Sequence, residues 1–430
     1  MINVFKSYIL LFLSCLFSLN VNAELTIEIT KGTESAVPIA IVPFSWQGPS
    51  PRPPVDLVEI IKSDLSRSGY FNLLDEQKML AKPTQAAKVR FRNWQALGQD
   101  YLTIGQVRDE RGRFKINFQL FDIYKSEQLM GYHMTVTARE LRASAHHISN
   151  VIYEKLTGIK GAFNTKIAYV TSFRGNNGQK TYKLQLADAD GFNPKTIMSS
   201  REPLMSPAWS PDGKKIAYVS FEKKSSAIYV QTLATGKRIR VSDFRGINGA
   251  PAWSPDGSKL ALTLSKDGSP DIFVLNLANR SLLKITKNYA IDTEPAWSPD
   301  GKNIVFTSDR GGKAQLYLVP SSGGRAKRLT FDGDYNARGS FSQDGKRLAM
   351  VHANRGDYRI AVMDIATRSI DVLTQGRLDE SPSFSPNGRM ILYSTRVGKR
   401  NALAAVSADG SMHQRLEFDR GEVREPAWSP

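Results

Sequence analysis

The chain repeats one short phrase along its C-terminal part. "SPAWSPDG" begins at Ser206, and close copies recur as far as the closing "EPAWSP". The equivalents of the first proline stand at Pro207, Pro251, Pro295, Gly339, Pro382 and Pro426. The steps between them are 44, 44, 44, 43 and 44 residues. A constant period of this kind indicates one structural unit per repeat, stacked on its neighbours.

Each repeat is predicted to hold four short strands. The first strand ends in the aromatic residue of the phrase, and "SPDG" favours a tight turn because proline presets φ and glycine accepts a positive φ. Runs rich in β-branched and aromatic residues follow, for example at 215–221, 227–233 and 237–243. Four strands in one such period match the size of a β-propeller blade.

The two ends of the repeat region complement each other. Strand-like runs at 166–173 and 182–191 have no phrase before them, whereas the last phrase has no strands after it. There are six phrases and six groups of following strands. They match only if the last phrase supplies the missing first strand of the first group, and this arrangement closes a ring without an unpaired edge. The sequence therefore predicts a six-bladed β-propeller over residues 165–430, closed by the C-terminal strand.

Residues 24–160 lack the repeat and are predicted to form a separate, mixed α/β domain. Strands are expected at 25–30 and 36–44, with a hairpin at 101–123. Amphipathic helices are expected at 55–69 and 138–158, because apolar residues recur there at helical spacing. A linker is predicted at 157–164.

Residues 1–23 have the order of a secretory signal: Lys6 as the one charge, an apolar middle and a small residue at Ala23. We expect cleavage after Ala23, export, and a mature chain that does not span a membrane. Cys15, the single cysteine, lies inside this segment. A lipid-attachment role is disfavoured, since apolar residues continue beyond Cys15 and no leucine stands three residues before it. The mature chain is then expected to have no disulfide.

The formal net charge of +17 leaves an acidic partner open. The basic residues are scattered, however, which favours a solvated exterior. Nucleic-acid binding is a third functional class that rests on charge alone, and export argues against it.

Enzyme signatures are scarce. The sequence has no G-x-S-x-G, H-E-x-x-H or G-x-x-x-x-G-K-[ST] motif. His146 and His147 are adjacent on a predicted helix, where their side chains diverge by about 100°. The aspartates of the turn are interpreted as turn formers rather than metal ligands, and the recurring aromatic residues as packing between blades. We predict no catalytic residue, cofactor or metal; the alternative is a hydrolase with its site at the channel mouth.

The repeats differ most just before each phrase. Segments there link the outer strand of one blade to the inner strand of the next, so the ring gathers all six at one end of the channel. Loops on a rigid scaffold often carry function. The candidate docking residues are Met205, Ile247, Asn248, Ala250, Asp292, Thr293, Glu294, Asn336, Arg338, Asp379, Glu380, Arg424 and Glu425. An ordinary solvated rim remains the alternative.

A second candidate is the predicted mature N-terminus. Leu25, Ile27 and Ile29 alternate with polar residues, as in a strand with one apolar face. Such a strand can pair within its own molecule or add to the sheet edge of a partner. The candidate binding residues are Glu24, Leu25, Thr26, Ile27, Glu28, Ile29 and Thr30.

With these residues laid out, the chain resembles the TolB family, the periplasmic proteins of the Tol–Pal system of Gram-negative bacteria. The resemblance covers almost the whole length and rests on residues 38–49, 201–213, 247–257 and 292–300 together with the terminal "EPAWSP". It implies an α/β domain on a six-bladed propeller without catalysis.

The resemblance further implies a monomeric periplasmic adaptor that supports envelope integrity and outer-membrane constriction at cell division. It implies that the lipoprotein Pal docks on the channel-end residues and that the inner-membrane protein TolA binds Glu24–Thr30. Docking of one partner is expected to influence the other. Bacteriocins exploit the Pal surface in the family, and no nucleic acid is implied.

Overall fold

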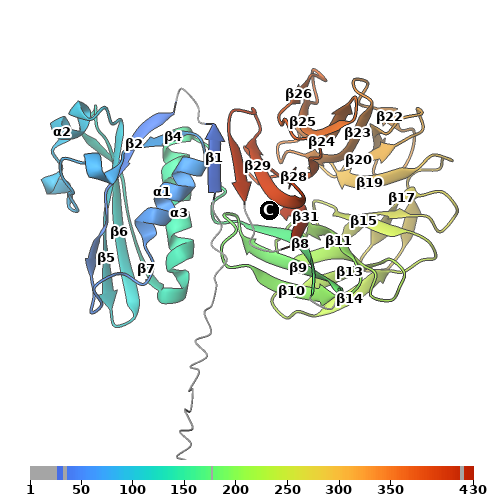
Figure 1. Cartoon of the computed structure of the whole chain (residues 1–430), viewed down its shortest axis with the longest axis horizontal. Coiled ribbons are helices and arrows are strands. Elements are labelled where there is room, and N and C mark those ends of the chain that lie inside the picture. Colours follow the sequence, from blue (N-terminus) through green and yellow to red (C-terminus); the bar gives the residue numbers. More distant parts are fainter. Residues whose placement is uncertain (1–26, 32–35, 176–177, 417–420) are drawn as a thin grey trace, which may run out of the picture.

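The computed structural model describes residues 27–31, 36–175, 178–416 and 421–430, and it places two bodies side by side (Figure 1). The predicted signal segment 1–23, with Cys15 and the cleavage site, lies outside the described residues, as do Glu24, Leu25 and Thr26. In the part of the chain that is described, no helix has the length and apolar character needed to cross a membrane.

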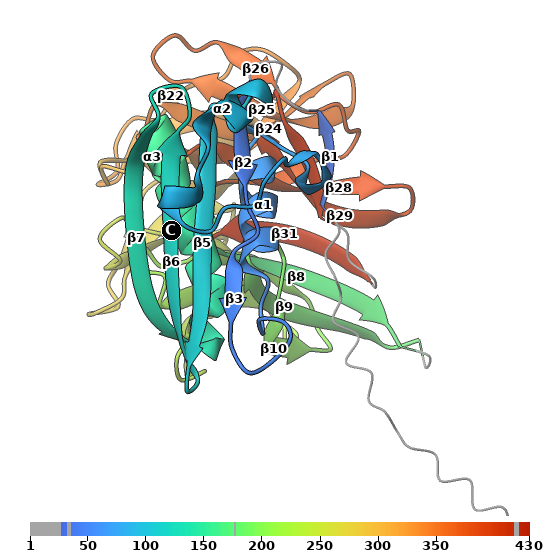
Figure 2. The ribbon, with the colours of Figure 1, turned by 90° about the vertical axis from the view of Figure 1, so that its left-hand side faces the viewer.

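The N-terminal body is a mixed sheet with its two long helices against one face (Figure 2). Its strand order is β4-β2-β5-β6-β7, and β3 pairs with β5. The strands are β2 (Val37–Ile41), β3 (Ser45–Gln47), β4 (Phe71–Leu73), β5 (Tyr101–Glu110), β6 (Arg113–Asp122) and β7 (Glu127–Thr137). The helices are α1 (Leu57–Arg67), α2 (Phe91–Ala96) and α3 (Leu141–Thr157), with single 3₁₀ turns at Glu76–Lys78, Ala86–Lys88 and Ala138–Glu140.

Both predicted long helices are confirmed, and their ends follow from local chemistry. Asp56 caps α1 by accepting the backbone N–H groups of Val58 and Glu59. Gly158 ends α3 in the left-handed region at φ 72°. The apolar faces of α1 and α3 pack on the sheet in one continuous core. The sequence did not predict α2, which with the 3₁₀ turns covers part of the opposite face, or the largely exposed β7.

The C-terminal body is the predicted propeller of six four-stranded antiparallel blades. Blade 1 holds β8 (Lys166–Arg174), β9 (Lys180–Asp188), β10 (Lys195–Ser200) and β31 (Glu422–Trp428); blade 2 holds β11 (Leu204–Trp209), β12 (Lys215–Ser220), β13 (Ala227–Thr232) and β14 (Arg238–Ser242). Blade 3 holds β15 (Asn248–Trp253), β16 (Lys259–Leu264), β17 (Asp271–Asn276) and β18 (Leu282–Lys284); blade 4 holds β19 (Asp292–Trp297), β20 (Asn303–Ser308), β21 (Gln315–Pro320) and β22 (Lys327–Arg328). Blade 5 holds β23 (Tyr335–Phe341), β24 (Arg347–Asn354), β25 (Asp357–Asp364) and β26 (Ile370–Val372); blade 6 holds β27 (Glu380–Phe384), β28 (Met390–Val397), β29 (Arg400–Ser407) and β30 (His413–Leu416).

Closure of the ring occurs as the sequence predicts. β31 pairs antiparallel with β8, with Trp428 opposite Ile167. The indole of Trp428 donates to the hydroxyl of Thr165 at 2.8 Å, and its backbone N–H donates to the hydroxyl of Ser383 on blade 6 at 2.9 Å. The last strand therefore joins the first blade to the last.

The SPDG turn has the predicted chemistry, as residues 254–258 show. Ser254 donates its hydroxyl to Asp256, which also accepts the backbone N–H of Ser258. These hydrogen bonds, that of Ser254 foremost, lower the pKa of Asp256 to about 2. Gly257 adopts the positive φ of 69° that the turn requires. The aspartate is thus committed to the turn, in agreement with its interpretation as a turn former.

The N-terminal strand β1 (Ile27–Lys31) does not join its own domain. It pairs antiparallel with β30 and becomes a fifth strand on the outer edge of blade 6, so that it lies between the two bodies (Figure 1). Nearby, the side chain of Gln414 on β30 donates to the backbone carbonyl of Arg67 at the end of α1. Asn387 of blade 6 donates to the backbone carbonyl of Lys160 at 2.9 Å. Blade 6 therefore holds β1 and part of the domain junction.

Candidate protein-docking surface

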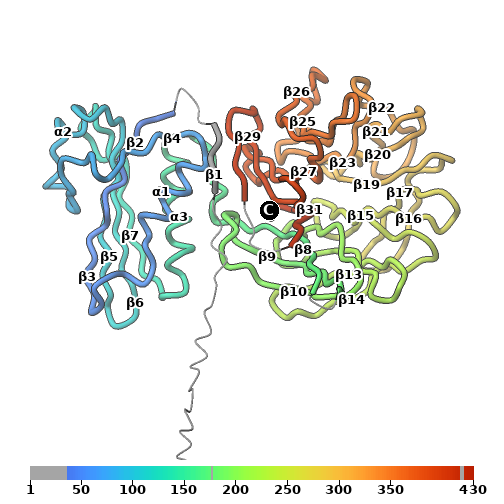
Figure 3. Tube along the Cα trace, in the orientation of Figure 1, coloured from blue at the N-terminus to red at the C-terminus, as the bar shows by residue number. Residues whose placement is uncertain are grey.

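Six inner strands contact one another in turn around the propeller centre: β11, β15, β19, β23, β27 and β31. Figure 3 labels all of them except β11. Each begins with variable residues and ends with the repeated phrase. The variable residues therefore meet at one end of the channel and the phrases at the other. The structure places most of the candidate docking residues at the start of these inner strands, rather than in the preceding loops as expected.

The residue directly before the first proline of each phrase, or before Gly339 in the fourth phrase, has an unusual backbone. It lies in the left-handed region in every blade, with φ between 45° and 57°, and none of the six is glycine. Each lies at a register shift between the inner strand and its neighbour. The residues are Ser206, Ala250, Glu294, Arg338, Ser381 and Glu425. A β-bulge of this kind re-aims a side chain, and here it recurs around the whole ring.

The re-aimed side chains meet across blade boundaries. The Arg338 guanidinium lies 2.8 Å from Glu294 of blade 4 and donates to the hydroxyl of Ser381 of blade 6. Glu294 also accepts the hydroxyl of Thr307 at 2.9 Å. Glu425 of blade 1 accepts the backbone N–H of Ser206 of blade 2. The channel end is therefore a ring of polar contacts from five blades.

Arg338 is the cationic member of this ring. Burial alone would lower the pKa of Arg338, but the carboxylates of Glu294, Glu425 and Glu380 raise it above its ordinary value. The guanidinium consequently stays charged among three acidic residues, which gives the centre of this surface a negative balance.

A different position, three residues before the first proline of the phrase or its equivalent, is buried in every blade. Its side chains range from 0% to 3% exposed: Leu204, Asn248, Asp292, Asn336, Asp379 and Val423. Four of these were predicted to contact a partner, namely Asn248, Asp292, Asn336 and Asp379. The structure contradicts a direct contact, because these side chains face into the blades.

The four buried polar side chains brace neighbouring segments. Asn248, Asn336 and Asp379 bond the loops that lead to their inner strands, and Asp292 bonds the turn after β20. Asn248 accepts the backbone N–H of Phe244 at 2.9 Å and donates to its carbonyl at 2.7 Å. Asn336 donates to the carbonyl of Asp332 at 2.7 Å. Asp292 accepts from Arg310 at 2.7 Å. Their role is to hold the loops in shape, since buried polar groups stabilise a fold only when they are hydrogen-bonded.

Asp379 gives this arrangement a pH dependence. Burial raises the pKa of Asp379 although the hydroxyls of Thr374 and Thr395 donate to it, each at 2.6 Å. A carboxyl with a higher pKa in the folded state contributes stability at low pH, and that contribution is lost as the pH rises through the folded-state pKa. We expect the free energy of unfolding of Asp379→Asn to increase relative to that of the wild type as the pH rises from about 4 to 8. The increase should be about 1.4 kcal/mol per unit of pKa shift. Thermal unfolding of both proteins across this range measures it, and a constant difference in melting temperature would contradict it.

The other candidate docking residues reach the surface to different extents. Met205, Ile247 and Arg424 are exposed. The half-buried ones are Ala250, Thr293, Glu294, Arg338, Glu380 and Glu425.

The sequence analysis missed an apolar component of the same end. Phe244, Tyr289, Ile291 and Phe331 belong to the loops that precede the inner strands and are 39% to 101% exposed. The signal was available, because each is a large apolar residue within a short polar loop. Together with Met205 and Ile247 they lie at the same channel end as the polar ring, on the side formed by blades 2 to 5. We call the polar ring and these six apolar side chains the docking surface.

The opposite channel end carries the phrases. Trp209, Trp253 and Trp297 each donate the indole N–H to a backbone carbonyl of the preceding blade, at 3.0 to 3.1 Å. This confirms their predicted packing between blades. The same aromatic residues and the prolines beside them also line a cavity of about 440 Å³. The indole N–H groups are already bonded, so this end presents few free hydrogen-bond donors.

The second candidate, the N-terminal strand, is described from Ile27 to Lys31. Ile27 lies opposite Leu416, Glu28 opposite Arg415 and Ile29 opposite Gln414, with a register shift before Lys31. The strand is thus held within the molecule by pairing to a blade edge. Glu24, Leu25 and Thr26 lie outside the described residues.

Comparison with known proteins covers both bodies. Residues 25–129 match the model of the TolB amino-terminal domain, and residues 153–430 match that of the TolB beta propeller domain. The chain is 61% identical to the Tol-Pal system protein TolB of Thioalkalivibrio sulfidiphilus over 98% of its own length and 97% of that protein. It is 63% identical to the Tol-Pal system protein TolB of Nitrosococcus oceani over 96% and 94% of the two chains.

A solved structure agrees with these matches. The crystal structure of TolB from Acinetobacter baumannii superposes with a TM-score of 0.87 at 44% identity, covering 95% of this chain and all of that one. Six blades closed by β31, an α/β domain beside them and these full-length matches lead to one conclusion: the chain belongs to the TolB family of Tol-Pal system proteins.

Proposed function

We propose that this protein is a non-enzymatic periplasmic adaptor of the cell envelope. In this proposal the docking surface binds the lipoprotein Pal, and the N-terminal strand binds TolA. Support for the first half comes from the composition of the docking surface. Large apolar side chains exposed together are uncommon on proteins without a partner, and in protein–protein interfaces they supply much of the binding energy.

One observation carries the proposal: exposed apolar residues lie beside a preformed, mostly acidic ring at the same channel end. Ile247 and Tyr289 are 49% and 101% exposed, whereas Glu294 and Arg338 pair across blades within the ring. An apolar contact around fixed charges gives both affinity and orientation. A Pal surface with apolar anchors and a basic centre would be complementary.

The chemistry of the ring supports an adaptor over a hydrolase. Glu294 is engaged by Arg338 and Thr307, and Glu425 by the backbone of Ser206. A general acid and a general base need a proton-transfer route to substrate, and these carboxylates are occupied by internal partners.

Two isoleucines offer a matched test of Pal binding. Ile247 on the docking surface and Ile239 on β14, the fourth strand of blade 2, are both 49% exposed. We expect Ile247→Asp to weaken binding of the soluble domain of Pal at least tenfold, about 1.4 kcal/mol, because it places a charge in an apolar contact. Ile239→Asp should bind as the wild type does. Calorimetric titration measures both, and equal affinities for the two variants would contradict the docking surface.

The N-terminal strand supports the second half of the proposal. β1 is a five-residue strand that adds to the edge of a blade, and it pairs through main-chain hydrogen bonds that another sheet edge can offer equally well. A strand of this kind can exchange between β30 and a partner. Binding of Pal and of TolA would then be coupled whenever Pal changes how firmly β1 is held.

Deleting residues 24–31 tests this part. We expect loss of detectable TolA binding with Pal binding retained, because the docking surface lies on the propeller. A pull-down with each purified partner measures it. TolA captured equally well by the shortened protein would refute the strand assignment and leave the Pal assignment standing.

A further inference from the structure

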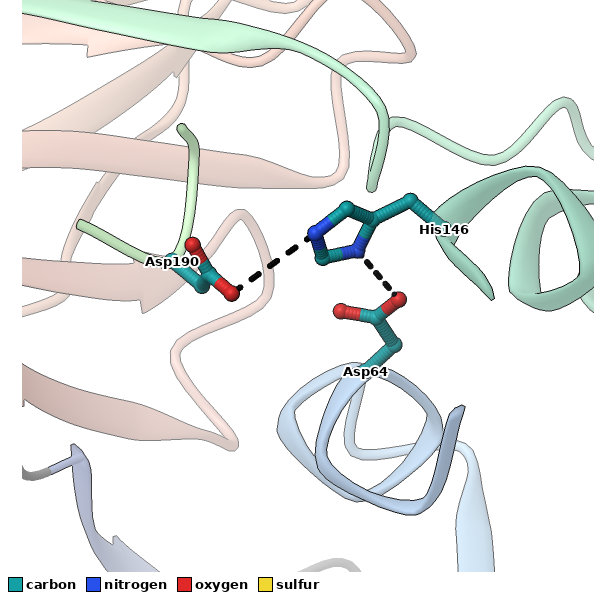
Figure 4. Close-up of side chains that lie close together, drawn as sticks. All are labelled: Asp64, His146 and Asp190. Carbon is teal, nitrogen blue, oxygen red and sulfur yellow. Dashed lines mark hydrogen bonds and ion pairs between the residues drawn. The ribbon is translucent and has the colours of Figure 1, made fainter. Parts of the chain in front are cut away.

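A buried histidine lies at the boundary between the two bodies (Figure 4). His146 on α3 is 2% exposed, and its Nδ1 lies 2.7 Å from Oδ2 of Asp64 on α1. Its Nε2 faces Oδ2 of Asp190, in the turn that follows β9 of the propeller, at 3.7 Å. One imidazole therefore stands between a carboxylate of each domain.

The two ring nitrogens differ in their contacts. Nδ1 is within hydrogen-bond distance of Asp64, whereas Nε2 is buried without a hydrogen-bond partner. With Nδ1–H donating to Asp64, a neutral ring directs the lone pair of Nε2 at the Asp190 carboxylate, which is an unfavourable arrangement. A protonated ring carries N–H on both nitrogens and is attracted to both carboxylates.

Charged groups around the imidazole come from three elements. From α1, Arg67 lies 2.8 Å from Asp64. From α3, Arg142 pairs with Asp190 and lies 3.4 Å from Asp188 of β9. Burial alone would raise the pKa of Asp190, but Arg67, Arg142 and His146 lower it, so that Asp190 stays ionised.

The same contacts argue against a metal ion, although Asp64, His146 and Asp190 bring suitable ligand atoms within 4.8 Å of one another. Arg67 and His146 occupy the two oxygens of Asp64, and Arg142 and the backbone N–H of Phe192 occupy those of Asp190. A divalent cation would have to displace two guanidinium groups. A proton on Nε2 displaces nothing.

We propose that His146 is a proton-operated clamp between the two domains. Protonation at Nε2 adds a charge-assisted contact from α3 to Asp190 and holds the turn after β9 against the α/β domain. Loss of that proton leaves Asp190 with its ionic contact to Arg142 and with the nearby positive charge of Arg67. The clamp would make the mutual docking of the domains depend on whether His146 carries this second proton.

The neighbouring histidine supplies the control. His147 is exposed and contacts Tyr132, so His147→Gln changes a titrating group on the same helix without touching the clamp. His146→Gln keeps a polar side chain that cannot take up the proton, and Asp190→Asn removes the propeller carboxylate while leaving α1 and α3 intact. Hydrogen-exchange protection factors of amides 188–192 report how firmly the turn is held.

Between about pH 8 and pH 5 we expect protection in this turn to rise at least about threefold in the wild type and in His147→Gln. The rise should vanish in His146→Gln and in Asp190→Asn. Protection that is independent of pH in the wild type, or that rises equally in His146→Gln, would overturn the clamp. Protection restored at high pH by added zinc alone, and lost in His146→Gln, would also overturn it in favour of a metal site.

Discussion

Removing Pro426–Pro430 is expected to lower the melting temperature of the protein by about 5 °C or more, the result of losing at least about 3 kcal/mol. The deletion removes contacts to three blades at once. Trp428 bonds Thr165 and Ser383, and the carbonyl of Ala427 accepts the indole N–H of Trp209. The start of β8, at Ile167 and Ala168, would then lose its pairing and present an unpaired edge.

Trp297→Ala is the comparison for this deletion. It removes an equivalent indole, bonded to the carbonyl of Ala252 at 3.1 Å, from a blade whose four strands are continuous in sequence. Differential scanning calorimetry of the two proteins separates loss of a side chain from loss of closure. If the deletion variant is at least as stable as Trp297→Ala, closure of the ring by β31 does not stabilise the protein beyond the loss of one indole.

The second large effect is expected at Arg310. Replacing it with alanine should lower the free energy of unfolding by about 3 kcal/mol. The substitution leaves the carboxylate of Asp292, which is 0% exposed, buried without its positively charged partner. Oδ2 of Asp292 accepts from Arg310 at 2.7 Å, and its Oδ1 is buried without a partner. Arg310 also stacks over Tyr317 at 4.9 Å, so part of the loss is packing.

A double substitution isolates the ionic part. Asn248 and Asn336 hold the position of Asp292 in the two neighbouring blades. Asp292→Asn should therefore be accommodated, and Arg310→Ala combined with Asp292→Asn should recover much of the lost stability. Urea unfolding of the two single variants and the double variant gives the coupling energy. Strictly additive losses would mean that the pair is not coupled.

The constant period predicted the propeller because each repeat can bury its apolar faces only against a neighbour. The same reasoning predicted the docking end but not the direction of each side chain. Asp292 and Asn336 vary between repeats as surface residues do, yet a shared register places them inside the blades. One signal was available: the same repeat position holds the apolar residues Leu204 and Val423 in two blades and short polar residues in the others, a pattern that indicates a buried position.

Contacts between distant segments that the repeat does not relate to each other could not be predicted. The alternation in 25–30 fixes which side chains share a face and leaves the pairing partner open, so the attachment of β1 to β30 needed the structure. His146 was considered only beside His147. Its place on the buried face of α3 follows from helical spacing, but Asp190 comes from another domain and no local pattern indicates it.

The most direct test of the central claim is a hydrogen-exchange footprint of the soluble domain of Pal on this protein. We predict protection concentrated in residues 244–250, 288–294 and 331–338, which carry the exposed apolar side chains and much of the polar ring. Hydrogen exchange of the backbone amides around the tryptophan- and proline-lined cavity at the other channel end should not change. Protection confined to that cavity, or to the α/β domain, would contradict the assignment of the docking surface.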